Sequence, residues 1–138
     1  MTMKAPKDFV CTPVSRVAVS WICVATNDGN PLHLDPEFAK KAGYKDVVVP
    51  GHILIGWMGQ YLEELCEGDP SRILDWKIRF TLPVWPGDQF TLRGELGANS
   101  GAEDVQTVTV TAISQENKVC GIVTATLGTI GVSKNAPH

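Results

Sequence analysis

The sequence predicts an α+β fold, in which an antiparallel sheet covers one long helix that is enclosed on all sides. The stretch from Gly51 to Leu65 has the character of a helix and is apolar on every face of its first two turns. Four segments after it alternate apolar and polar residues with the period of two that is typical of strands. Each strand therefore has one apolar face, and the apolar helix is the layer that such a sheet needs.

Length and charge limit the kind of protein this can be. With 138 residues and a net charge of −3, the chain is expected to form one domain over residues 1–138, with a core from about 9 to 132. No basic stripe is visible, so we expect no binding to nucleic acid or to a membrane surface. The apolar run 53–58 is too short to span a bilayer, and residues 1–8 lack the apolar core of a signal peptide.

The cysteines indicate a reducing environment. They are scattered along the chain without a C-x-x-C pair, at Cys11, Cys23, Cys66 and Cys120. This distribution favours free thiols and a cytoplasmic protein.

The first predicted element lies within residues 14–26 and could be a helix or a strand, because the segment is rich in valine and isoleucine. Its apolar residues do not alternate, which favours a helix capped by Ser15. The pairs Asp28-Gly29 and Asn30-Pro31 then indicate a turn.

A short helix and an extended segment follow this turn. Residues 35–37, Asp-Pro-Glu, are types that suit the N-cap and the first two positions of a helix, and Gly43 ends that helix. Residues 47–49 are expected to be extended, because a residue that precedes a proline such as Pro50 avoids the helical region.

The long helix begins near residues 50–52 and has about fourteen residues, a length of about 21 Å. Its first two turns carry five large apolar side chains: Ile53, Leu54, Ile55, Trp57 and Met58. Burying them would contribute on the order of 10 kcal/mol before opposing terms are counted. Gly56 and Gly59 would let neighbouring backbone come close, and charge returns only at Glu63 and Glu64.

The predicted strands come after this helix. The first covers residues 74–82 and is expected to place five residues on its apolar face: Leu74, Trp76, Ile78, Phe80 and Leu82. The others cover residues 90–96, 108–112 and 119–127, with a loop rich in Gly, Asn and Ser before the third strand.

A carboxylate and an imidazole occur close together in the turn. Asp28 and His33 lie five positions apart, and two such groups facing one small space can hold a water molecule and move its protons. The alternative is structural, because an Asp can initiate a turn through its own backbone and a His in a loop is usually solvated. The residues by themselves leave both interpretations open.

The run from Asp28 to Ala39, Asp-Gly-Asn-Pro-Leu-His-Leu-Asp-Pro-Glu-Phe-Ala, resembles the signature of the (R)-specific enoyl-CoA hydratases and MaoC-like dehydratases. Their pattern is Gly-Asp-x-Asn-Pro-apolar-His, followed by five residues and a small residue. The resemblance includes Pro50-Gly51 and residues 80–88, and covers about residues 15–128. It implies the hot-dog fold, a curved antiparallel sheet around one long helix.

The resemblance also implies functional roles. Asp28 and His33 would bind and activate the water that adds to an enoyl thioester. The backbone N–H of Gly51 would hydrogen-bond the thioester oxygen, at a helix N-terminus that favours negative charge. Asn30 would shape the turn. The partner is an acyl thioester of coenzyme A or acyl carrier protein, with no further cofactor and no metal, and a homodimer or higher oligomer is expected, with a heteromer possible.

The chain departs from the family pattern at three positions. Asn27 replaces the usual Gly before the acid, Pro50 replaces the usual His before Gly51, and His52 stands where an apolar residue is usual. The first two changes alter the wall of the site. His52 has two open interpretations, because it could line the substrate channel or only cap the helix.

Three rival functions remain open. His33, Asp35 and His52 have the composition of a two-histidine, one-carboxylate metal site. A hot-dog thioesterase would carry its acid on the central helix, where Glu63 and Glu64 lie only at the far end. A non-catalytic MaoC-like partner subunit of a heteromeric dehydratase would tend to lack the Asp/His pair that this chain keeps.

Overall fold

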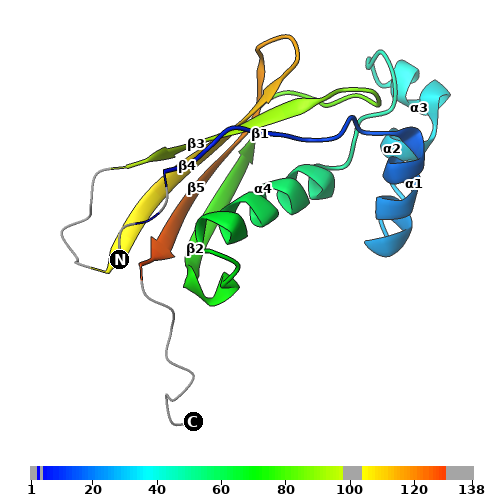
Figure 1. The fold of residues 1–138 in the computed structure, drawn as a ribbon. Helices are drawn as coiled ribbons and strands as arrows, with labels where there is room; N and C mark the ends of the chain where they lie inside the picture. The colour runs from blue at the N-terminus through cyan, green and yellow to red at the C-terminus, as the bar shows by residue number, and fades with distance from the viewer. Residues whose placement is uncertain (1–2, 4, 98–103, 130–138) are drawn as a thin grey trace.

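Within the residues that the structure describes, an antiparallel five-stranded sheet and one helix, α4, form the body of the protein (Figure 1). The structure is a computed structural model that describes residue 3, residues 5–97 and residues 104–129. The expected end of the core at 130–132 and most of the loop before the third predicted strand lie outside these residues. The strand order is β1-β3-β4-β5-β2.

All neighbouring strands pair antiparallel, as predicted. The sheet is made of β1 (Phe9–Val10), β2 (Ile73–Phe80), β3 (Phe90–Leu96), β4 (Val105–Ser114) and β5 (Val119–Gly128). The two-residue strand β1 pairs with β3 and was not predicted, because two residues are too few for an alternating pattern.

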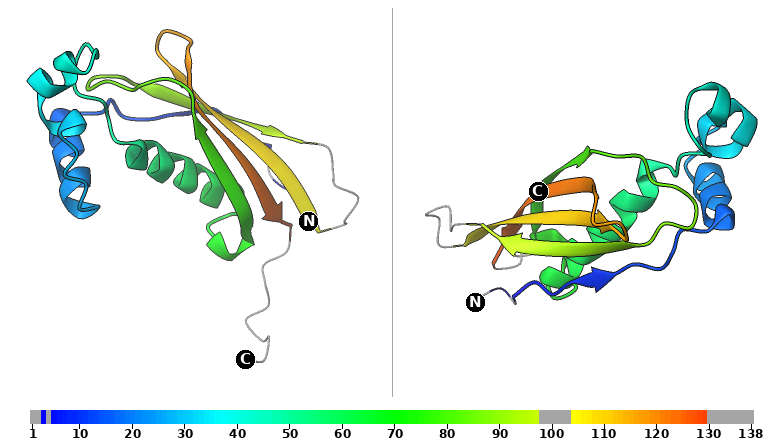
Figure 2. Two further views of the ribbon diagram at one scale, coloured as in Figure 1. Left: turned by 180° about the vertical axis from the view of Figure 1, so that it is seen from behind. Right: turned by 90° about the horizontal axis from the view of Figure 1, so that it is seen from above.

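One stripe of α4 (Gly51–Leu65) packs against the sheet, which curves over the helix in Figures 1 and 2. The buried residues recur at helical spacing, which places them on one face: Leu54, Met58, Tyr61, Leu62 and Leu65. The helix is central, as predicted, but within one chain it is not enclosed on all sides. Ile53, Ile55 and Trp57 are only half-buried, because a single sheet covers one side of a helix.

The helix and the sheet pack closely at Gly121 in β5. A Cβ atom added there would lie 2.8 Å from Leu54 Cδ2 and 3.7 Å from Met58 Cε. These distances are possible only without a side chain at this position, so Gly121 lets α4 pack directly on the strand.

The predicted alternation of β2 is partly wrong. A bulge between Ile73 and Asp75 shifts the register, so Ile73, Trp76 and Ile78 pack against the core while Leu74 is half-exposed. Phe80 and Leu82 are also half-exposed, because β2 ends at Phe80 and the chain leaves the sheet there.

Three short helices lie beyond one end of the sheet, as all views in Figures 1 and 2 show. They are α1 (Arg16–Ala25), α2 (Pro31–Leu34) and α3 (Pro36–Lys41). The helix predicted within residues 14–26 is confirmed, and Ser15 Oγ accepts a hydrogen bond from the N–H of Ala18 at 3.0 Å. Asp35 caps α3 in the same way through the N–H groups of Glu37 and Phe38.

All four cysteines are free and buried, and desolvation raises the pKa of the Cys11 thiol to about 11. Among the described residues, every helix is too short or too polar to cross a membrane.

The core assignment can be tested at Leu62, whose side chain is fully buried. Leu62→Ala should lower the free energy of unfolding by about 2–5 kcal/mol, because it leaves a cavity under the sheet. Val10→Ala, at a side chain that is 60 % exposed, should change it by less than about 0.5 kcal/mol. Chemical denaturation followed by circular dichroism measures both, and equal losses would contradict this core.

Candidate active site

The turn that carries the acid is built by local hydrogen bonds. Asn27 has φ +53°, a left-handed conformation that glycine and asparagine adopt most readily, which explains why Asn can replace the usual Gly here. The N–H of Asp28 bonds the carbonyl of Cys23 at 2.8 Å and closes α1. Asn30 Oδ1 accepts from the N–H of Leu32 at 3.0 Å, so the side chain of Asn30 caps α2 and holds the turn.

His33 lies on α2 rather than in an open turn, and its side chain is only 14 % exposed. Its Nδ1 is 2.5 Å from the carbonyl oxygen of Val48. A carbonyl oxygen only accepts hydrogen bonds, so Nδ1 must carry the proton and donate it. In the neutral imidazole Nε2 is then the atom with the free lone pair.

Asp28 and His33, which the sequence singles out, are brought together. Asp28 Oδ2 lies 3.5 Å from His33 Nε2, and the Asp28 side chain is 25 % exposed. With the neutral ring in this tautomer, both atoms are acceptors and cannot hydrogen-bond each other. One water molecule has two O–H donors and can satisfy both, which leaves its oxygen lone pairs facing away from the pair.

The segment before α4 links this pair to the rest of the protein. The N–H of Val48 bonds the carbonyl of Leu32 at 3.0 Å, and the N–H of Val49 bonds the carbonyl of Val84 at 2.8 Å. Residues 47–49 are therefore extended between α2 on one side and the loop after β2 on the other. The helix α4 begins directly after them, with Pro50 at its N-cap.

Gly51 occupies the first turn of α4, where a helix provides no acceptor for its N–H. A Cβ atom added to Gly51 would lie 2.6 Å from Phe80 Cζ, so the phenyl ring packs over bare backbone. This N–H, which has no acceptor among the described residues, and the helix dipole together suit an oxygen that carries negative charge.

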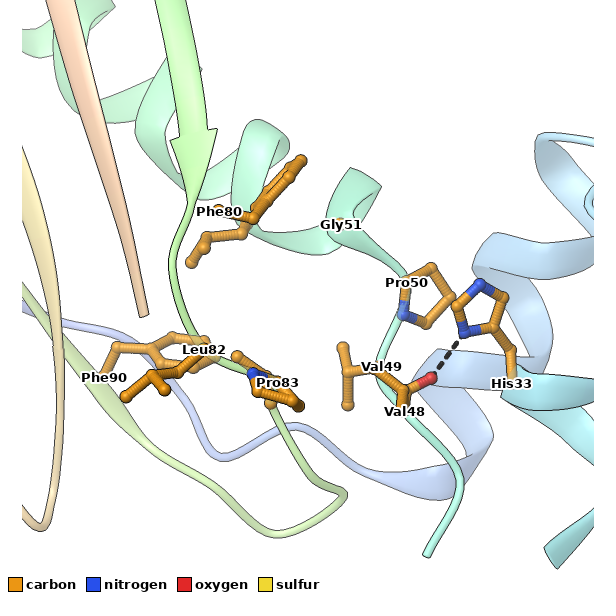
Figure 3. Close-up of a pocket in the computed structure, with 11 residues that line it drawn as sticks. His33, Val48, Val49, Pro50, Gly51, Phe80, Leu82, Pro83 and Phe90 are labelled. Carbon is orange, nitrogen blue, oxygen red and sulfur yellow. Dashed lines mark hydrogen bonds between the residues drawn. The ribbon is translucent and has the colours of Figure 1, made fainter. Parts of the chain in front are cut away.

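His33 and Gly51 line one pocket, which has a volume of about 170 Å³ (Figure 3). Pro50 also lines it, and the remaining wall is apolar: Val48, Val49, Leu54, Phe80, Leu82, Pro83, Val84 and Phe90. Asp28 is not among these lining residues and is connected to the pocket through His33. An apolar pocket with one imidazole and one N–H at a helix start can bind an acyl group and polarise its carbonyl.

Other predicted residues lie elsewhere. His52 is exposed and is not among the residues that line the pocket, and among the described residues its side chain has no hydrogen bond to the start of α4. Asp35 serves as the cap of α3. No group of three or more metal-ligating side chains occurs in residue 3 or in ranges 5–97 and 104–129. Glu63 and Glu64 are exposed.

Sequence reasoning missed most of the pocket wall. Val48 acts through its backbone carbonyl, which has no sequence signal. Phe90 and Leu54 were placed in the core as apolar residues, and nothing in the alternation pattern indicates that they border a pocket.

The fold defines a class of protein, because similar solved structures share it along nearly the whole chain. An (R)-hydratase from A. caviae involved in PHA biosynthesis superposes with a TM-score of 0.77 at 25 % identity, over 91 % of this chain and 96 % of that one. The ChsH1–ChsH2 complex from Mycobacterium tuberculosis matches with a TM-score of 0.77 at 21 % identity, over 93 % and 97 % of the two chains, and supports the fold alone. The protein therefore has the hot-dog fold.

Sequence comparison identifies the family. Residues 6–118 match the family described as MaoC like domain, and the chain belongs to this family. The (R)-specific enoyl-CoA hydratase of Aeromonas caviae is 31 % identical over 97 residues, which are 70 % of this chain and 72 % of that protein. The probable enoyl-CoA hydratase 2 of Dictyostelium discoideum is 36 % identical over 92 residues, 62 % of this chain.

Several relatives are much longer than this chain. It spans 31 % of the Dictyostelium protein, 12 % of the peroxisomal multifunctional enzyme type 2 of Mus musculus and 34 % of the peroxisomal enoyl-CoA hydratase 2 of Arabidopsis thaliana. The match with these proteins is thus a match with one part of each.

The tautomer of His33 can be observed directly. At a pH where the His33 ring is neutral, nitrogen-15 NMR should show its proton on Nδ1, because the Val48 carbonyl accepts a hydrogen bond from that atom. His52, which is exposed and has no such acceptor within the part of the chain that the structure describes, serves as the internal comparison. A neutral His33 ring protonated only at Nε2 would contradict the arrangement described above.

Proposed function

We propose that this protein catalyses the reversible addition of water to a trans-2-enoyl thioester, as an (R)-specific enoyl-CoA hydratase or 3-hydroxyacyl-thioester dehydratase. One observation carries the proposal: two acceptors, Asp28 Oδ2 and His33 Nε2, lie 3.5 Å apart beside an apolar pocket that also contains the N–H of Gly51. The Aeromonas hydratase, at 31 % identity, supports the same class of reaction.

The pair supplies proton transfer. Water is a poor nucleophile at neutral pH, and Asp28 takes one of its protons while His33 orients it. The water oxygen forms a bond to C3 and the C2=C3 double bond is lost. The pair then returns a proton to C2 through His33, so both side chains regain their starting protonation states. The reverse sequence dehydrates a 3-hydroxyacyl thioester.

Gly51 supplies charge stabilisation. As the C3–O bond forms, negative charge develops on the thioester oxygen. The backbone N–H at the start of α4 donates a hydrogen bond to that oxygen, and the helix dipole adds to the stabilisation. The resemblance to the hydratases supports two further parts of the proposal, the carrier of the acyl group and the stereochemistry of the product. The substrate is attached to coenzyme A or acyl carrier protein, and the product is the (R)-3-hydroxy isomer.

A second candidate is a supporting subunit in a heteromeric dehydratase. The ChsH1–ChsH2 and HadBC complexes from Mycobacterium tuberculosis are structural neighbours, at 21 % and 17 % identity. Against this candidate, the present chain keeps both Asp28 and His33, and their Oδ2 and Nε2 atoms are close enough for one water molecule to bridge them. Hydration of an enoyl-CoA by the purified chain alone would distinguish the two.

The chain should form a homodimer or a larger assembly. The eight-residue strand β2 lies at an edge of the described sheet, and α4 is covered on one side only. Trp21 and Val24 on α1 are 73 % and 82 % exposed, which adds uncovered apolar surface. Light scattering coupled to size exclusion at micromolar concentration measures the mass, and a monodisperse monomer would refute this expectation.

Asp28→Asn and His33→Asn should each lower kcat on crotonyl-CoA by about 10²–10⁴-fold, because each removes one group that acts on the water. The Asn at position 33 keeps a donor for the Val48 carbonyl but lacks Nε2. The double variant should be little worse than either single one, since the two groups share one water.

Melting temperatures are needed beside these rates. His33→Ala would lose the bond to Val48 from a mostly buried position, so it is expected to destabilise the protein, whereas the two Asn variants should stay close to wild type. Near wild-type turnover in folded Asp28→Asn would refute the assignment of the acid.

A further inference from the structure

The pocket beside His33 has an open rim and a closed floor. Phe80 and Leu82 at the rim are 49 % and 44 % exposed. At the floor, Leu54 is 3 % exposed and Phe90 is 1 % exposed. Figure 3 shows Phe80, Leu82 and Phe90 across the pocket from His33. The pocket therefore ends inside the protein.

The chemistry of the wall selects what can enter. Of the eleven described residues that line the pocket, His33 alone has a polar side chain. The amide groups of a pantetheine arm would lose their hydrogen bonds in such surroundings, at a high cost in free energy. A hydrocarbon tail loses nothing. When the thioester oxygen bonds Gly51 and C3 faces the Asp28–His33 pair, the tail is the part of the substrate that fits the floor.

The size of the pocket then limits the length of the tail. An apolar cavity of about 150 Å³ is known to hold benzene, which has six carbons. The present pocket, at about 170 Å³, is of similar size. We propose that the protein is selective for short acyl groups of about four to six carbons, and that Leu54 and Phe90 set this limit. This inference rests on the proposed function, because it assigns the acyl group to the same site.

The floor cannot easily move away from a longer tail. Leu54 Cδ2 is pressed against Gly121, where an added Cβ would lie only 2.8 Å from it. Met58, in the next turn, is fully buried and also lies close to Gly121. Gly59 of the same helix packs against β2, where the ring of Trp76 lies 3.7 Å from the position of a Cβ added to Gly59. All of these contacts are within one chain, so the depth of the pocket is a property of this sequence.

The test is a series of trans-2-enoyl-CoA substrates from C4 to C12, each with its kcat/KM. The value should be highest at C4 or C6 and should fall by at least about tenfold from C6 to C10, as expected when extra methylenes do not fit an apolar pocket. An optimum at C10 or longer would overturn this inference and leave the proposed hydration intact.

Leu54→Ala provides the direct test of the floor. It should raise kcat/KM for C8 and C10 substrates about tenfold relative to C4, because it opens space beyond the present end of the pocket. Leu65→Ala is the matched control: Leu65 is a buried leucine of the same helix, 7 % exposed, and is not among the residues that line this pocket. It should lose stability without a change in preference. If Leu54→Ala does not fold, Leu54→Val gives a smaller shift in the same direction.

Binding separates this inference from the proposed reaction. Calorimetry with saturated butyryl-, hexanoyl- and decanoyl-CoA measures the pocket without any turnover. Tighter binding of the two short thioesters would support the inference even if no hydration were detected, in which case only the proposed function would fail. Tightest binding of decanoyl-CoA, or an unchanged length profile in folded Leu54→Ala, would overturn it.

Discussion

The site depends on hydrogen bonds made by the extended segment that precedes α4. Val48 is hydrogen-bonded to α2 twice: its N–H donates to the carbonyl of Leu32, and its carbonyl accepts from the imidazole of His33. The N–H of Val49 donates to the carbonyl of Val84 in the loop after β2. These bonds join the helices at one end of the sheet to the body of the protein. They also place an imidazole with a defined tautomer beside the start of a helix, which is the relation that the proposed chemistry needs.

Close packing around two glycines gives the pocket its shape. At Gly51 the ring of Phe80 lies over bare backbone, so the rim of the pocket comes near the free N–H of the helix. At Gly121 the same helix rests on β5 through Leu54, and this contact closes the floor. In the proposed function, binding of the carbonyl and selection of the tail would both depend on how α4 lies on the sheet. Interiors pack at nearly crystalline density, so a change of one methyl group at either position alters the pocket.

A small sheet cannot cover a helix that is apolar all round, and the exposed surface reflects this constraint. Ile53, Ile55 and Trp57 on α4 are only half-buried in one chain, and α1 exposes Trp21 and Val24. The apolar character of α4 was evident from the sequence, but periodicity does not reveal whether a second layer comes from the same chain or from a partner. Enclosure of the helix on all sides is therefore expected of the predicted oligomer, in which a second sheet covers what one chain leaves half-buried.

The sequence by itself determined the features that depend on neighbouring residues. Ser15 and Asp35 begin the helices that their residue types predicted, and the Asp28-to-Ala39 run pointed to the family. Only the tertiary structure decided which nitrogen of His33 carries the proton, because the acceptor is a backbone carbonyl fifteen residues away. It also decided the depth of the pocket, since that depth depends on the packing of one helix against strands far along the chain, and such contacts have no local signal in the sequence.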